Sequence, residues 1–361
     1  MKKLLLATAI AALSVSAANA APTVYGKAFL AADFVSGEFD SDVDDRFDND
    51  DDSLNINSHA SRIGLRGSEA MTANTDVIYQ LEYGTRIDGD GVDGFKNRDT
   101  YLGVVNKQFG EVRVGKNQSS LDRINNVVVN QGYWDNLGSN KLDSNQNLEA
   151  LNMADSGRMN SSIIWTAPKY EGLPLQLAAM YSSDDTNSND NDGFGVALMF
   201  DQGTGFTAGI AYDKDQNIAG DIIRGTATLD MSKYVAYPIT LGALYQVADF
   251  DDTEANTDNK KEKGLVVSGE MGLTNFARPA SVYLQYNKTD NLQGYNNSDS
   301  DQIVLGGKYM FKDNIIMHAY AGMNNADNVE TVGNLNEEEV NLPTKGDVDV
   351  FVVGTGLEYK F

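Results

Sequence analysis

The sequence predicts an all-β protein: a transmembrane, antiparallel, up-and-down β-barrel of 16 strands, with short turns at one end and long loops at the other. Three observations predict this fold. Apolar residues repeatedly occupy every second position, short and long connections alternate, and no stretch after residue 20 approaches the roughly 20 continuous apolar residues of a membrane-spanning helix. In lipid, such strands satisfy all their backbone groups only if the sheet closes on itself.

The first 20 residues predict an export signal. Lys2 and Lys3 precede an apolar run from Leu4 to Val15, and Ala18-Asn19-Ala20 has the small residues that a signal peptidase cuts after. The run is too short for a membrane anchor. We therefore expect a signal peptide at 1–20, cleaved after Ala20, and a single barrel domain at 21–361.

Period-two patterning marks the strands. Residues 77–83, 175–181, 282–287 and 357–361 each place apolar side chains at alternate positions, with more polar residues between them in most cases. This is the pattern of a strand with one lipid-facing side and one side facing water. In the last segment the apolar face is formed by Leu357, Tyr359 and Phe361.

The connections set the number of strands. Seven short turns and eight long loops alternate along the chain, which gives 16 strands and a barrel about 35 Å across, too wide for side chains to fill. The short turns are expected near 73–74, 108–110, 171–174, 202–205, 236–238, 276–279 and 312–314. The long loops are expected near 35–54, 86–97, 118–157, 182–192, 213–220, 249–263, 288–300 and 324–346.

The composition excludes several classes of function. Asp and Glu number 52 against 28 Lys and Arg, a net charge of −24, or −26 once the two lysines of the signal are removed, so nucleic acid is not an expected partner. The chain has no cysteine and only His59 and His318, which leaves little for thiol, imidazole or metal chemistry. No G-x-S-x-G element occurs. We expect neither an enzyme nor a resident cofactor.

Two acidic segments are compatible with solvated loops. Asp40 to Asp52 contains eight aspartates, and Asp184 to Asp192 is rich in Asp, Asn and Ser. Neither matches the ligand spacing of an EF-hand. Loosely bound divalent cations that bridge to lipopolysaccharide are the alternative to plain solvation at these loops.

Three elements carry a family resemblance: Tyr25-Gly26-Lys27-Ala28, the segment from Ser61 to Glu69, and the ending from Leu357 to Phe361. With them, the chain from Ala21 to Phe361 resembles the general, non-specific porins of the Gram-negative outer membrane. The resemblance implies a homotrimer in that membrane, short periplasmic turns, long external loops and a third loop, here 118–157, folded into the lumen. It also implies that Leu357, Tyr359 and Phe361 are recognised by the barrel assembly machinery.

The resemblance implies a row of basic side chains on the barrel wall at the pore constriction. Lys27, Arg62, Arg98 and Arg158 match the family's wall positions, and Arg66 shares the face of Arg62.

Alternation supports this row. If Ile63 and Leu65 face lipid, Arg62 and Arg66 face water. Arg98 faces in if Tyr101 and Val105 face out. Arg158 faces in if Met159 faces out together with Ile163 and Trp165. A guanidinium near the middle of the lipid face costs about 2–4 kcal/mol, which favours the inward placement.

The opposing carboxylates are expected on the third loop. Gly132-Tyr133-Trp134-Asp135 resembles the family's Gly-Tyr-x-Asp, so Asp135 is the first candidate. The Pro-Glu-Phe-Gly element that follows it in the family is absent here. The other candidates are Asp122, Asp143, Glu149 and Asp155, which spacing does not rank.

One further basic residue suggests a contact between subunits. Lys116 shares the face of Val112 and Val114 and is therefore expected to point outward near the external rim. In the family, a basic residue of this element meets acids of a neighbour's second loop. Here the candidates for this trimer latch are Asp88, Asp90 and Asp93.

The resulting hypothesis is a passive diffusion channel for ions and small hydrophilic solutes. Mild cation preference is expected because the negative charge is concentrated in the external loops. A sugar-selective porin is the alternative, since Tyr133 and Trp134 in the inward loop could form an aromatic track for sugars.

Overall fold

The computed structural model describes residues 22–89, 94–135, 150–155, 157–169, 172–183, 192–251, 260–334 and 341–361. The predicted signal peptide lies outside the described residues. The strands are β1 (Thr23–Ser41), β2 (Asn49–Ser58), β3 (Arg62–Thr72), β4 (Thr75–Gly84), β5 (Lys96–Asn106), β6 (Gly110–Gln118), β7 (Arg158–Thr166), β8 (Leu175–Ser182), β9 (Gly193–Asp201), β10 (Phe206–Lys214), β11 (Gly220–Asp230), β12 (Ile239–Phe250), β13 (Glu262–Gly272), β14 (Ala280–Asp290), β15 (Asp299–Lys312), β16 (Ile315–Asn334) and β17 (Asn341–Lys360). Short 3₁₀ turns are η1 (Asp45–Phe47), η2 (Leu121–Ile124), η3 (Gly132–Trp134), η4 (Met231–Lys233) and η5 (Leu292–Gly294).

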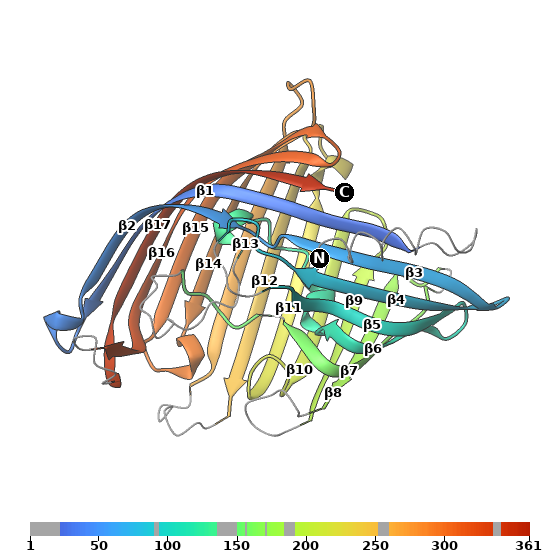
Figure 1. Ribbon diagram of the computed structural model, residues 1–361, viewed down its shortest axis with the longest axis horizontal. Helices are drawn as coiled ribbons and strands as arrows, with labels where there is room; N and C mark the ends of the chain where they lie inside the picture. The colour runs from blue at the N-terminus through green and yellow to red at the C-terminus, as the bar shows by residue number, and fades with distance from the viewer. Residues whose placement is uncertain are drawn as a thin grey trace, which may run out of the picture.

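The strands form one closed antiparallel ring (Figure 1). From β3 to β17 each strand pairs with its neighbours in the chain, and β1 closes the ring on β17 with Lys27 opposite Lys360. β2 pairs with the outer half of β1, and β3 pairs with residues Thr23 to Lys27 of the same strand. Because β2 and β3 are two halves of one barrel strand, the barrel has 16 strands, and the predicted fold class is confirmed. Within the described ranges, no helix is long and apolar enough to span a membrane.

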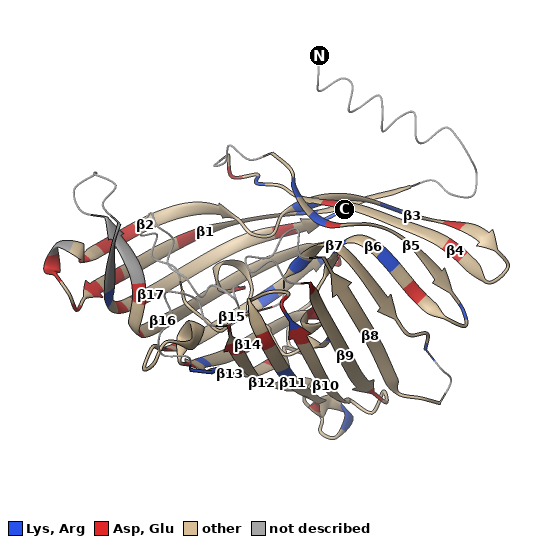
Figure 2. Ribbon diagram, turned by 90° about the horizontal axis from the view of Figure 1, so that it is seen from below, with Lys and Arg blue, Asp and Glu red and all other residues tan. Residues whose placement is uncertain are grey.

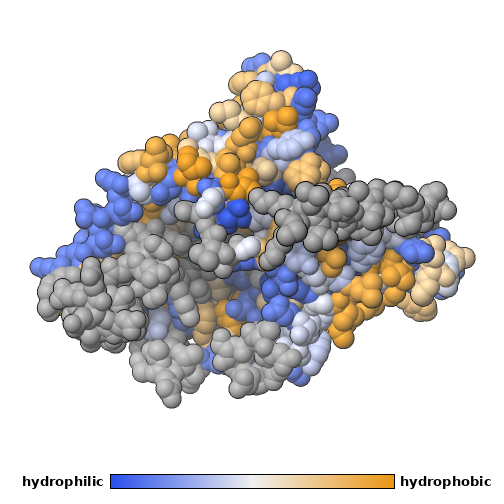
Figure 3. Space-filling model, viewed as in Figure 1, coloured by the Kyte–Doolittle hydropathy of each residue, from blue (hydrophilic) through white to orange (hydrophobic). Residues whose placement is uncertain are grey.

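The predicted alternation places apolar side chains on the outer surface. Leu177, Leu284, Leu305 and Leu357 are 40–59% exposed, whereas Val304, next to Leu305, is fully buried on the inner side. Figure 3 shows the apolar residues gathered over the flank of the barrel, with hydrophilic residues at the end where β1 and β2 turn. This exposed apolar surface is the face that lipid covers.

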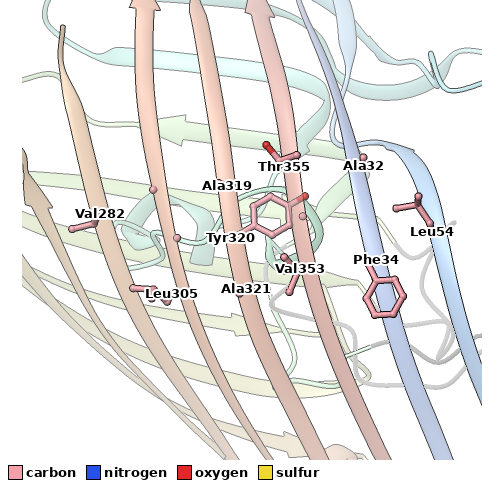
Figure 4. Close-up of a pocket in the computed structure, with 13 residues that line it drawn as sticks. Ala32, Phe34, Leu54, Val282, Leu305, Ala319, Tyr320, Ala321, Val353 and Thr355 are labelled. Atoms are coloured by element: carbon pink, nitrogen blue, oxygen red, sulfur yellow. The ribbon is translucent and has the colours of Figure 1, made fainter. Parts of the chain in front are cut away.

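A shallow apolar groove crosses the outer surface from β14 to β2 (Figure 4). Small residues such as Ala32 and Ala319 line it together with the larger Phe34, Leu54 and Leu305. The groove lies within the apolar outer surface that faces lipid.

The strand ends differ from the prediction at two external loops. The expected loops at 35–54 and 324–346 are largely strand, since β1 continues to Ser41 and β16 to Asn334. Acidic residues gather at the ends of β1, β2 and β17, as Figure 2 shows. Hairpins that extend beyond the bilayer no longer need a lipid-facing side, so charged residues are tolerated there. Their inward side still packs: Phe39, Val348 and Val350 are at most 4% exposed.

Candidate functional site

The described legs of the third loop, 119–135 and 150–155, lie inside the barrel against the wall formed by β9 to β16. On the outward leg, Leu121 and Ile124 of η2 pack in one cluster with inner residues of β9 to β11, and the Val129 backbone N–H donates to Gln285 Oε1 on β14 at 2.8 Å. On the return leg, the Leu151 N–H donates to Asn324 Oδ1 on β16 at 2.8 Å. The loop therefore narrows the lumen from one side and leaves the wall of β1 to β6 facing it.

Glycines of the wall make this close approach feasible. A Cβ built on Gly264 of β13 would clash with the Met153 sulfur, and one on Gly322 of β16 would lie 2.8 Å from the Trp134 ring. The same relation holds for Gly209 of β10 and Ile124, with a distance of 2.8 Å. Real Cβ contacts of this length do not occur, so side chains at these positions would displace the loop.

The return leg is also held by a buried arginine that the sequence analysis missed. Arg224 on β11 is fully buried; its Nη2 lies 2.7 Å from Asp155 Oδ1, and its Nε donates to Gln246 Oε1 at 2.8 Å. Gln246 Nε2 donates in turn to the Ala154 carbonyl at 2.6 Å, and Glu262 accepts from the Ala154 N–H at 2.9 Å. Asp155 thus pairs with the wall behind the loop instead of facing the predicted basic row.

The predicted basic row lies on the free wall, but it is accompanied by carboxylates that the sequence analysis did not assign. Glu82 on β4 accepts from Arg98 Nε at 2.7 Å and from the Tyr25 hydroxyl at 3.0 Å, and it lies 3.7 Å from Arg62 Nε. Arg66 places its guanidinium 4.8 Å from the centre of the Tyr25 ring. Glu82 is therefore the centre of a charged network on β1, β3, β4 and β5.

Two more acids pair with Lys27 and Arg158. Lys27 Nζ lies 3.7 Å from Glu358 Oε2 on β17, and Arg158 Nε donates to Asp99 Oδ1 at 3.0 Å. Every predicted basic wall residue except Arg66 is consequently within 4.0 Å of a carboxylate on the wall itself. The positive charge facing the lumen is smaller than a row of unpaired cations would give.

The predicted outward faces of Tyr101 and Met159 were wrong, although Arg98 and Arg158 still pair with carboxylates of the wall. Tyr101 faces the lumen, since its hydroxyl donates to Gln80 Oε1 at 3.3 Å while Leu102 is 61% exposed on the outer face. A register shift opposite Leu81 and Tyr83 changes the alternation before Tyr101 is reached and brings Arg98 to Glu82. Such bulges reverse the faces of a strand and have no reliable sequence signal.

The second wrong face is that of Met159. Its side chain is 7% exposed and packs with Ile164 and Met180 on the inner side. The β6–β7 register shifts between Gly115 and Asn117, and Ser161 has a positive φ of 44°. This bulge places both Met159 and its neighbour Arg158 away from lipid.

The loop carboxylates occupy different environments. Asp135 follows the buried Trp134 and is exposed; the charges that act on it are Lys27, His59 and Arg62 from the wall and Asp155 from the loop. Burial raises the pKa of the Asp122 carboxyl above its usual range, and the Asp155 carboxylate adds to this rise. Asp143 and Glu149 lie outside the described residues. Among the described loop acids, Asp135 is influenced by Lys27 and Arg62, and Asp122 by Arg158, so both lie within electrostatic reach of the basic row.

The two described residues of the predicted latch, Lys116 and Asp88, form no ion pair with each other within one chain. Asp88 accepts from the Ser58 N–H at 2.9 Å and pairs with Arg86 at 2.9 Å. Lys116 has no carboxylate within 4.0 Å among the residues that the structure describes. Asp90 and Asp93 lie outside the described residues.

The C-terminal residues close the ring. Leu357, Tyr359 and Phe361 are 45–53% exposed on the outer face. Phe361 exchanges two backbone hydrogen bonds with Gly26, at 2.9 and 3.1 Å. The last residue of the chain therefore pairs with the first barrel strand.

Comparison with known proteins identifies the fold. The family model described as Gram-negative porin matches residues 7–329. The chain belongs to the Gram-negative porin family. Outer membrane protein S2 of Salmonella typhi is 25% identical over 362 residues, covering 87% of this chain and 90% of that protein. Outer membrane porin PhoE of Enterobacter cloacae is 22% identical, with both chains covered completely.

Solved porin structures share the architecture. The anion-selective porin from Comamonas acidovorans has a TM-score of 0.67 at 16% identity and covers 95% of this chain and 100% of its own. In-vitro folded OmpT of Vibrio cholerae, described as a trimer form, has a TM-score of 0.60 at 16% identity and covers 95% of this chain and 100% of its own. This porin is accordingly an outer-membrane channel protein of a Gram-negative bacterium, and its relatives are channels rather than enzymes.

Proposed function

We propose that this porin is a passive diffusion channel for ions and small hydrophilic solutes, with a mild preference for cations. The observation that supports the proposal is the packing of the described loop legs on the β9–β16 wall, from which we infer a passage between Asp135 and the network around Glu82. Fixed charges on both sides of a water-filled passage orient polar solutes and disfavour lipophilic ones.

Cation preference is supported by where the charge lies. The five cations of the basic row are partly balanced by three carboxylates, Glu82, Glu358 and Asp99, so the row contributes a smaller positive field than unpaired cations would. The acidic external ends of β1, β2 and β17 then dominate the potential at the mouth (Figure 2). We further propose that these acids hold divalent cations loosely beside lipopolysaccharide.

A sugar-selective channel is the second candidate function. The burial of Trp134 disfavours it. Trp134 is 1% exposed because it packs over Gly322, so its ring offers no surface to a passing sugar. Of the two loop aromatics on which the sugar hypothesis rests, only Tyr133 is partly buried rather than fully buried.

Two measurements test the proposed function. The reversal potential across a KCl gradient should show a permeability ratio of K⁺ over Cl⁻ above one. Liposome swelling rates should fall smoothly with solute size for maltodextrins and for size-matched non-sugars alike. Anion preference would refute the proposed selectivity, and saturable, faster uptake of maltodextrins would favour the sugar channel.

A homotrimer is part of the proposal. It is supported by the family and by the trimer form of a solved relative. In such a trimer, Lys116 at the external rim would meet acids of the second loop of a neighbouring copy. We also propose that the exposed Leu357, Tyr359 and Phe361 are the residues that the barrel assembly machinery binds.

A further inference from the structure

The two histidines of the chain occupy different environments. His59 lies in the break between β2 and β3, and its side chain is 17% exposed. His318 on β16 is 2% exposed and lies near Glu358. Phe29 separates the two rings, at 5.6 Å from His59 and 4.8 Å from His318. Only His59 is accessible to the water of the lumen.

The break between the strands turns His59 inward. Ala60 has a positive φ of 49°, and the His59 N–H donates to the Phe29 carbonyl at 3.0 Å, so β1 continues across the irregularity. Asn57 before the break and Arg62 after it both contact inner-wall acids, although strict alternation would put them on opposite faces. The break therefore adds an imidazole to the wall beside Arg62.

A chain of polar contacts links His59 to the third loop. His59 Nε2 lies 2.8 Å from Asp33 Oδ2, and Asp33 is fully buried. The Tyr320 hydroxyl donates to Asp33 Oδ1 at 2.6 Å and accepts from the Tyr133 N–H of the loop at 3.4 Å. Asn57 also donates to Asp33, at 2.7 Å. His59 is thus held at the narrowed level of the barrel.

The polar groups around His59 come from four elements, and the charged ones from three of them. Asp33 and Lys27 lie on β1, Arg62 on β3 and Asp135 on the loop, and the uncharged Tyr320 completes the set from β16. Behind Phe29 are His318 on β16 and Glu358 on β17. Among side chains in general, histidine is the one whose charge ordinarily changes near physiological pH.

We propose that His59 is a specificity-determining residue whose protonation sets the ion preference of the channel. This inference deepens the proposed function and rests on it. Protonated His59 adds one positive charge to the wall opposite Asp135 and so repels cations at the narrowest level. Neutral His59 leaves the balance between Asp135, Lys27 and Arg62 unchanged, and the channel is then more cation-preferring.

The test is the reversal potential of the full-length porin in planar bilayers across a KCl gradient, measured from pH 8 to pH 5. In the wild type, the permeability ratio of K⁺ over Cl⁻ should fall by about twofold as pH falls, the size expected for one charge near a hydrated pathway. His59→Gln should lose most of this fall and keep the high-pH ratio. His59→Lys should be fixed near the low-pH ratio at every pH.

His318→Gln is the matched control, because it removes the other imidazole from a site closed to water; it should keep the full fall. A wild-type ratio that does not change with pH would overturn the inference. An unreduced fall in His59→Gln would overturn it as well. If neither the wild type nor any variant formed a conducting channel, the proposed channel function would fail. Failure of the channel function is thus distinguishable from failure of the proposed role of His59.

Discussion

The guanidinium of Arg224 on β11 lies 2.7 Å from the carboxylate of Asp155 on the third loop, and the Arg224 side chain is fully buried. The pair joins the barrel wall to the return leg of the loop, with Gln246 bonded to both Arg224 and the Ala154 carbonyl. These contacts hold the described return leg of the loop against the barrel wall.

Replacing Arg224 with Gln should loosen the loop. The substitution leaves Asp155 without its cation, a loss of about 3–5 kcal/mol for a buried pair. We expect a lower melting temperature of the folded barrel on unheated SDS gels and more open-channel noise in bilayers. Lys288→Gln is the control, since its pair with Asp290 is 43–45% exposed and contributes little. Equal melting temperatures and noise for both variants would contradict the anchoring role.

Gly264 should tolerate no large side chain. A leucine there would meet the Met153 sulfur and push the return leg toward the β1–β6 wall, so single-channel conductance should fall while the protein remains folded. Gly269→Leu is the control on the same strand, because the nearest side-chain atom lies 3.5 Å from its Cβ position, on the outer face beside Leu241. Unchanged conductance in a folded Gly264→Leu porin would show that the loop does not line the passage.

Glu82 should set the charge balance of the wall. Glu82→Gln leaves Arg62 and Arg98 without their carboxylate, and we expect the permeability ratio of K⁺ over Cl⁻ to fall by about twofold. Arg62→Gln should move the ratio in the opposite direction. Both are read from reversal potentials at one pH. A shift of the same sign in the two variants would be inconsistent with the network described around Glu82.

Lys116 should matter for the trimer and not for the barrel. Lys116→Glu places a negative charge at the rim where acids of a neighbour's second loop are proposed to bind, so trimers should dissociate at a lower temperature on SDS gels. Lys107→Glu, on the short turn between β5 and β6, should leave the trimer unchanged. If trimers of both variants dissociated at the wild-type temperature, the latch would be refuted.

Most of the fold could be predicted from the sequence, because lipid imposes a strict period of two on the strands it covers. Beyond the bilayer this constraint ends, which is why the extended hairpins of β1–β2 and β16–β17 were expected to be loops. The β-bulges could not be predicted from the sequence either. The faces of Tyr101 and Met159 were wrong because a single extra residue reverses the alternation.

The candidate site was predicted less completely. The basic residues could be placed by their likeness to the family, and the pattern put Glu82 on the face opposite Leu81 and Tyr83. Its pairing with Arg62 and Arg98 depends on the register of three neighbouring strands, which one sequence does not contain. Arg224 gave no signal of its role, because its partner Asp155 is 69 positions away in a loop.

The central claim is that the barrel encloses a continuous water-filled passage narrowed by the third loop. The most direct test is single-channel recording of the purified, unheated oligomer in planar bilayers. The account predicts stable, ohmic openings that close in three equal steps, one for each proposed subunit. Bilayers that stay non-conducting with correctly folded oligomer, or openings whose size is unrelated to salt concentration, would contradict it.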